Sequence, residues 1–310
     1  MSMNGTVAVR TALALYPVRY RRERGEELAD VFADTTAGAG PVAKVRELFD
    51  LGAYGLRMRT GLTSSSGGGR LAALAAPLVV GAAGGLAAGH ALLTYLTLGL
   101  SRASLLYSLP YWVMCGAAVL SAVVAMLGRW TAAKLLAVVA ALAAVADLVR
   151  AVSEPQVVQP LWIFLAVFEW SGPFVFWALL LLAAPKDALP VPTWRERGLA
   201  LAAAVITPVA ALTDNVYTSF HQLDPQWRAL MIAVPLVMAL SAVRGWYLVA
   251  VPGLVALPWA VCVNLQALWQ QEGGAWRLLP MAVLTVAAAV ALALLGRPKG
   301  MAGPRGRQAA

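Results

Sequence analysis

The residues of this 310-residue chain that could do chemistry are a few ionisable side chains inside long apolar stretches. Glu169 is the foremost, because it falls near the middle of such a stretch and is followed by Gly172 and Pro173. A charge near the bilayer centre costs at least about 2.5–3.5 kcal/mol, and a proline frees a carbonyl and can kink or break the helix. A carboxylate at this position predicts an ion, proton or ligand site. The alternative is a neutral carboxylic acid that is hydrogen-bonded to a neighbouring helix.

Five other polar residues lie in the middle or outer parts of the apolar stretches. Asp147 and Arg150 stand three residues apart, so they can pair on one helical face. The others are His90, Asp214 and Asn264. One interpretation is a water-accessible cavity, open to the outside, that these residues line together with Glu169. The other is that they mark the ends of the spans, with Asp147 and Arg150 as a pair at the membrane interface and His90 as a packing residue.

No catalytic signature accompanies these residues. The sequence has no GxxxxGK[ST] phosphate loop, no HExxH and no GxSxG, and no nucleophile is paired with a base. The two cysteines, Cys115 and Cys262, form no CxxC and lie in apolar runs. We therefore expect no catalytic residue, metal or cofactor, and an enzyme ranks below the other functional classes.

Membrane-spanning helices must position the polar residues. The chain is 60% hydrophobic and 13% charged, against about 45–50% and about 25% in soluble domains, which excludes a single soluble core. The predicted fold is an all-α transmembrane bundle, with eight apolar stretches of spanning length. They cover approximately residues 71–98, 111–127, 135–152, 161–183, 199–218, 229–243, 247–268 and 278–295.

The positions of the basic residues support this count. With a cytosolic amino terminus, 20 of the 24 Lys and Arg residues fall on the cytosolic side, as the positive-inside rule requires. Eight of the 11 tryptophans fall at predicted span ends, where indole rings prefer to lie. We therefore expect a multi-pass plasma-membrane protein with both termini cytoplasmic. Its net charge of +9 reflects topology and attraction to anionic lipids, so no nucleic-acid partner is predicted.

Small residues recur in the first predicted span. Gly81, Gly85 and Gly89 stand four residues apart, which leaves bare backbone along one helical face and allows another helix to approach closely. This pattern favours packing within the bundle over dimerisation.

The chain begins with a charged region that differs from the rest. Pro17 predicts the start of a helix that runs to about Thr36, and Pro41 the start of a second. Their apolar residues have helical spacing; they are Tyr20, Leu28, Val31 and Phe32 in the first and Val42, Val45, Leu48, Phe49 and Gly52 in the second. We predict a cytosolic helical domain in residues 1–62, a Ser/Gly linker in 63–70, the bundle in 71–296 and a disordered basic tail in 297–310.

The segment from Leu15 to Leu28, LYPVRYRRERGEEL, resembles the LYPxxYRxxxGEEL opening of a group of actinobacterial integral membrane proteins. In that group a short cytosolic helical domain of the HAAS or permease-prefix type precedes several spans. Such domains are commonly associated with PadR-type transcriptional regulators. The resemblance therefore implies regulation or sensing at the membrane, and it implies no reaction.

Two functional classes follow from the sequence. The favoured one is a regulatory, sensory or accessory membrane protein whose amino-terminal domain contacts a cytosolic regulator or a membrane partner subunit. The alternative is a secondary transporter or permease subunit for a small solute or ion that uses Glu169.

Overall fold

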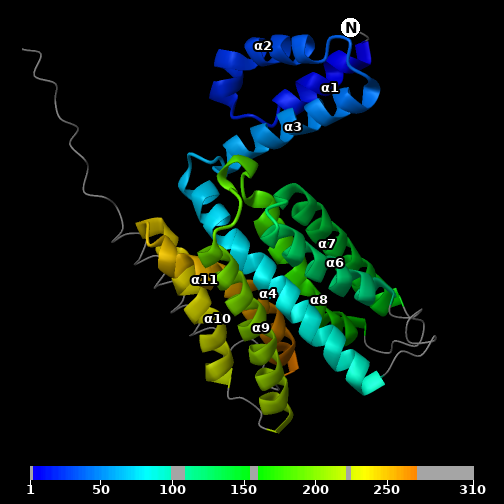
Figure 1. Ribbon diagram of the computed structural model, residues 1–310, viewed down its shortest axis with the longest axis vertical. Coiled ribbons are helices and arrows are strands. Elements are labelled where there is room, and N and C mark those ends of the chain that lie inside the picture. Colours follow the sequence, from blue (N-terminus) through cyan, green and yellow to red (C-terminus); the bar gives the residue numbers. More distant parts are fainter. Residues whose placement is uncertain (1–2, 99–108, 154–159, 221–224, 271–310) are drawn as a thin grey trace, which may run out of the picture. The chain divides into compact units, whose positions relative to one another are not determined.

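The computed structural model describes residues 3–98, 109–153, 160–220 and 225–270, and every regular element in these ranges is a helix (Figure 1). The chain divides into two compact units. The first consists of residues 1–76 and 180–191, and the second of residues 77–179 and 192–310. The predicted all-α class is confirmed over the described ranges.

The first unit contains the helices α1 (Met3–Leu13), α2 (Val18–Thr35) and α3 (Pro41–Thr60). Both predicted helix starts are confirmed, because Pro17 precedes the first residue of α2 and Pro41 is the first residue of α3. A proline suits these positions, since its missing N–H would have no partner there within the helix. The short helix η1 (Lys186–Ala188) also belongs to this unit.

Tyr16 is at the centre of the core of the first unit. Its side chain is 2% exposed and belongs to a buried cluster with Val9 and Leu13. Its hydroxyl donates a hydrogen bond of 3.1 Å to the carbonyl of Leu51 in α3, and its ring lies where a side chain on Gly55 would be. The absence of a side chain at Gly55 therefore lets α3 accommodate this ring.

The environment of Tyr16 makes the first unit sensitive to alkaline pH. Burial, with smaller effects from Tyr20 and Tyr54, raises the pKa of Tyr16 from 10.0 to about 12. The unfolded chain releases this proton first, so the contribution of Tyr16 to stability is complete below about pH 10 and is lost as the pH rises towards about 12. We expect the stability of the first unit, followed by near-UV circular dichroism, to fall over this range.

The Tyr16→Phe variant provides the control for this titration. It should lack the part of the alkaline loss that Tyr16 causes, although it lacks the hydrogen bond to Leu51 at every pH. An alkaline loss of the same size in the variant would show that Tyr16 is not its source.

Only some of the apolar residues that the sequence places at helical spacing in α2 and α3 join the core of the first unit. Tyr20, Leu28 and Phe32 pack against the core, as does Leu48. Val31 is 56% exposed, so this residue of the α2 row does not join the core. Three of the residues predicted for the apolar face of α3 are likewise exposed; they are Val42, Val45 and Phe49.

The helix α4 (Gly67–Leu98) begins earlier than the sequence suggested. The backbone N–H of Gly69 donates to the Ser66 hydroxyl over 3.1 Å, the arrangement of a serine that caps a helix. Residues 67–69, predicted as part of the linker, are therefore the first turn of α4.

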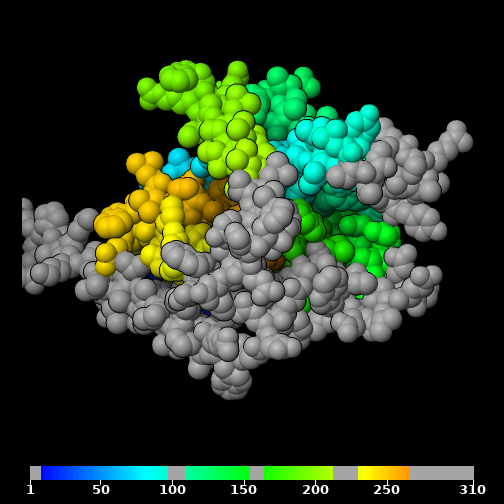
Figure 2. Space-filling model, turned by 90° about the horizontal axis from the view of Figure 1, so that it is seen from below, coloured from blue at the N-terminus to red at the C-terminus, as the bar shows by residue number. Residues whose placement is uncertain are grey.

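The described part of the second unit consists of long helices. They are the greater parts of α4 and of α8 (Pro160–Ala183), together with α6 (Leu109–Met126), α7 (Trp130–Ser153), α9 (Trp194–Phe220), α10 (Pro225–Leu240) and α11 (Tyr247–Gln270). Two hairpins are evident, α6 with α7 and α10 with α11, and the latter pair lies side by side in Figures 1 and 2. Each hairpin turns at a glycine with positive φ, Gly128 or Gly245.

Within the described ranges, four helices are long and apolar enough to cross a membrane: α4, α6, α7 and α11. They correspond to the predicted spans 71–98, 111–127, 135–152 and 247–268. The predicted spans 161–183 and 199–218 fall on α8 and α9, and the span 229–243 falls on α10 and the short helix η2 (Ser241–Arg244) that follows it. The eighth, 278–295, and the predicted tail lie outside the described residues.

Candidate functional site

The glycine face of α4 positions one side of the candidate site. Side chains on Gly81 and Gly85 would collide with the backbone of Ala200 and Ala204 in α9. One on Gly89 would place its Cβ 2.7 Å from the Cβ of Pro208. The three glycines therefore bring α4 against α9 within the chain, as expected for small residues between membrane helices.

A small cavity lies just beyond this contact and is surrounded by α4, α8, α9 and α11. Its volume is about 10 Å³, close to the minimum that admits one water molecule. The described residues that line it are Leu86, His90, Glu169, Trp170, Ala211, Trp259 and Val263. Two of the six polar residues singled out in the sequence thus share a cavity.

His90 is the most unusual of the lining residues. It is only 7% exposed, and its ring meets the Trp170 ring edge to face with 4.6 Å between the centroids. Neither ring nitrogen has a hydrogen-bond partner in the part of the chain that the structure describes. Because most buried polar atoms are hydrogen-bonded, these two nitrogens require an explanation.

The helix around Glu169 is continuous. The segment α8 runs through Gly172 and Pro173 to Ala183, so of the two expectations from the sequence, a kink or a break, the break does not occur. Pro173 still has no N–H to offer to the Glu169 carbonyl four residues earlier. A Cβ on Gly172 would lie 2.8 Å from the Cys262 sulfur, so this glycine brings α8 close to α11.

A tryptophan strengthens the contact between α8 and α11. Trp177 is 2% exposed, and its indole Nε1 donates to the carbonyl of Val255 over 2.9 Å. This carbonyl lies three residues before Pro258, in the turn that a proline disturbs. The indole hydrogen bond holds α8 and α11 together, and these two helices form two walls of the cavity.

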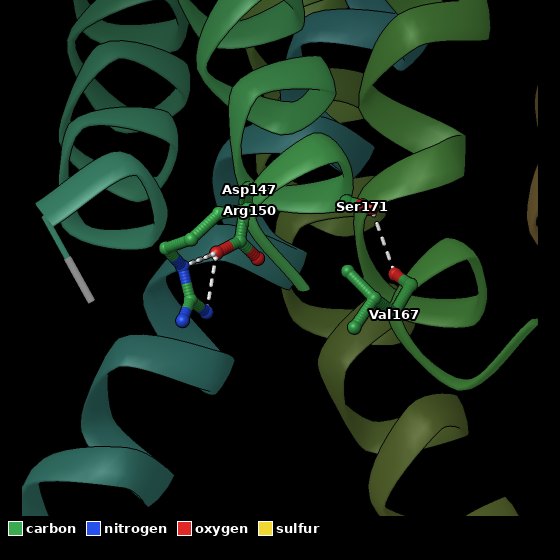
Figure 3. Close-up of polar contacts among 4 residues, drawn as sticks. All are labelled: Asp147, Arg150, Val167 and Ser171. Atoms are coloured by element: carbon green, nitrogen blue, oxygen red, sulfur yellow. Dashed lines mark hydrogen bonds and ion pairs between the residues drawn. The ribbon is translucent and has the colours of Figure 1, made fainter. Parts of the chain in front are cut away.

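Asp147 and Arg150 form a separate pair on α7. The Nη2 and Nε atoms of Arg150 lie 3.1 and 3.3 Å from the same Asp147 carboxylate oxygen (Figure 3). Asp147 is buried and lies near Tyr111 and Cys115 of α6. Neither member of the pair is among the described residues that line the cavity. The cavity predicted to collect all the polar residues therefore does not collect these two.

The remaining candidates, Asn264 and Asp214, are not among the described residues that line the cavity. Asn264 follows the lining residue Val263 and is fully buried; its Nδ2 donates to the Ala260 carbonyl over 2.7 Å, and its Oδ1 has no described partner. Asp214 lies on α9, and its side chain is outside the described residues.

A larger hollow of about 490 Å³ lies between α10 and α11. Its described lining is apolar throughout and consists of Leu230, Met231, Val234, Pro235, Ala256, Trp259 and Ala260. Binding sites for polar solutes carry a few polar groups that orient the ligand. This hollow has none among its described residues and is not a candidate site for such a solute.

Sequence reasoning identified Glu169 and His90 but missed Trp170 and Trp259. Tryptophan in a span reads as a packing or interface residue, and no spacing links residues on different helices. Over the described residues, no group of three or more His, Cys, Asp and Glu side chains could hold a metal.

Comparison of the chain with protein-family models, curated proteins and solved structures gave no match. In the part of the chain that the structure describes, the fold is all-helical, four helices are suited to crossing a membrane, and a small, partly polar cavity lies between helices of the second unit.

Proposed function

We propose that the protein is a regulatory or sensory plasma-membrane protein whose helices α1–α3 bind a cytosolic protein. In this proposal the chain spans the membrane eight times and both termini are cytoplasmic, as the distribution of basic residues favours. The observation that carries the proposal is an exposed apolar surface on α3. We call it the α3 stripe; it consists of Val42, Val45, Phe49 and Leu56.

The α3 stripe is exposed but apolar, whereas the exposed face of a helix in water is usually polar. Its four side chains are 81%, 61%, 79% and 50% exposed, and their spacing of three, four and seven residues places them on one side of the helix. The core-facing residues of α3 form a different row, with Leu48, Leu51 and Met58 against the core. α3 therefore has two apolar faces, and only one is covered by its own unit.

An apolar row of this kind is suited to a protein groove. Amphipathic helices bind grooves through anchors at i, i+3 and i+7, which is the spacing of Val42, Val45 and Phe49. A helix that lies on a membrane usually has a polar face rich in Lys and Arg, whereas α3 also carries Glu47 and Asp50. α3 also has four basic residues, Lys44, Arg46, Arg57 and Arg59, so its charge suits a lipid surface as well as a protein, and the spacing of the apolar anchors is what favours a protein groove.

Photo-crosslinking in cells tests the proposal. A photoreactive residue at position 49 of the full-length protein should capture one discrete cytosolic protein, and the same residue at position 31, exposed but on α2, should not. Phe49→Asp should reproduce the transcriptional effect of deleting residues 1–62, and Val31→Asp should leave transcription unchanged. Capture of lipid alone, or unchanged transcription after the deletion, would contradict the proposal.

A transporter or permease subunit for a small solute or ion is the second candidate function. The observation in its favour is the cavity that Glu169 shares with His90. The small size of this cavity counts against a solute larger than water. A proton-coupled carrier should lose transport but not expression in the Glu169→Gln variant, whereas a purely structural carboxylic acid should tolerate the exchange.

A further inference from the structure

We propose that the cavity between α4, α8, α9 and α11 binds one water molecule, hydrogen-bonded to His90 and Glu169, and that these three groups hold one exchangeable proton. The proposal goes beyond the regulatory function and does not depend on the α3 stripe. It begins from the two ring nitrogens of His90, which are buried without a described hydrogen-bond partner.

A water molecule satisfies the chemistry of these atoms. A neutral imidazole has one donor and one acceptor nitrogen, and leaving a buried polar atom unpaired costs about 1–3 kcal/mol. Buried water needs two to four polar partners and roughly 10–15 Å³ of space. The cavity provides about 10 Å³ with His90 and Glu169 in its wall. Water can donate to one group and accept from the other, so it fits both.

The charge balance of the site favours one bound proton. The rest of the described lining is aliphatic or aromatic, so a net charge there would be poorly solvated. One carboxyl group and one imidazole are together neutral when they share one proton. The proton can reside on Glu169 beside a neutral His90, or it can pass to the water, which transfers one of its own protons to His90. Both states have the same net charge.

The other titratable groups near this site can be named for the described residues. The Cys262 thiol of α11 interacts electrostatically with Glu169. On α9 the lining residue is Ala211. Asp214 lies three residues later on the same helix, and its side chain is not among those that the structure describes. On α4 and α8 the titratable residues among the described lining are His90 and Glu169 themselves. The proton is therefore assigned to these two residues and the water between them.

Infrared spectroscopy of the full-length protein in lipid nanodiscs tests the proposal. Exchange of ordinary water for H₂¹⁸O should shift an O–H stretching band of one buried water in the wild-type protein. Glu169→Gln should remove a protonated-carboxyl band, and His90→Gln should shift it. Ser171→Ala is the matched control, because Ser171 is a buried polar residue of α8 that bonds to Val167 within the helix (Figure 3). This control should leave both bands unchanged.

Tryptophan fluorescence provides a second readout. An imidazolium quenches an adjacent indole, and the His90 ring touches Trp170. The wild-type emission should therefore titrate with pH, and the component contributed by His90 should be lost in His90→Gln and kept in Ser171→Ala.

Three results would overturn the proposal. The absence of any ¹⁸O-sensitive buried-water band in the wild-type protein would show that the cavity is dry, whatever the variants do. Persistence of that band unchanged in folded Glu169→Gln and His90→Gln proteins would place the water elsewhere. A carboxyl band that responds to sodium at constant pH would show that a cation occupies the site. None of these results bears on the crosslinking at position 49.

Discussion

Gly85→Ala is expected to destabilise the helical bundle by about 3 kcal/mol, the upper end of the usual cost of overpacking. The added Cβ would overlap the Cα, carbonyl carbon and carbonyl oxygen of Ala204. Backbone atoms cannot move aside as a flexible side chain can, so α4 and α9 must separate. The free energy of unfolding in mixed micelles, measured by denaturant titration, checks this expectation.

Gly116→Ala is the matched control. Gly116 is in α6, and a Cβ there would have no described atom within 4 Å. The same chemical change should leave stability unaltered or raise it by up to about 1 kcal/mol, because alanine favours a helix over glycine. Equal losses in both variants would show that α4 and α9 do not approach closely at Gly85.

The close approach of α4 was predictable, but its partner was not. Glycines four residues apart allow close packing against any helix that has small residues on the facing side. The complementary signal is on α9, where Ala200, Ala204 and Pro208 have the same spacing. Several spans of this chain contain similar alanine rows, so the spacing alone could not identify α9. Only the packing of the whole second unit decides this.

In the candidate site, too, a contact within one helix could be predicted from the sequence, but a contact between helices could not. The Asp147–Arg150 ion pair follows from the three-residue spacing on one helix, and the structure contains it. His90 of α4 and Glu169 of α8 line one cavity, although the described helices α6 and α7 lie between α4 and α8 in the sequence. Such a contact depends on the bundle arrangement, which periodicity along one helix does not encode.

In the first unit, periodicity predicted α2 and α3 but not the orientation of their apolar residues. α3 has apolar residues on two faces, and the spacing of Val42, Val45 and Phe49 is as helical as that of the buried row. The second face could be distinguished only after Tyr16 and α1 were placed against the first. The exposed face is the one on which the proposed function depends.

Tyr16→Ala is expected to unfold the first unit while the helices of the second unit persist. Removing a large buried aromatic side chain costs about 3–5 kcal/mol, and a core of this size supplies only about 3–5 kcal/mol. Hydrogen exchange of the full-length protein, read by mass spectrometry, should therefore show loss of protection throughout α1–α3. Amides of α6, α7 and α11 should keep theirs.

Phe49→Ala distinguishes loss of the core from loss of an aromatic side chain in general. Phe49 is also aromatic but is 79% exposed, against 2% for Tyr16, so its removal should leave the exchange of α1–α3 unchanged. Retained protection in Tyr16→Ala would mean that the unit does not depend on this ring. Simultaneous loss of protection in α6, α7 and α11 would mean that the two units unfold as one. The expected pattern requires that the unit bearing the α3 stripe have a core of its own, built around Tyr16.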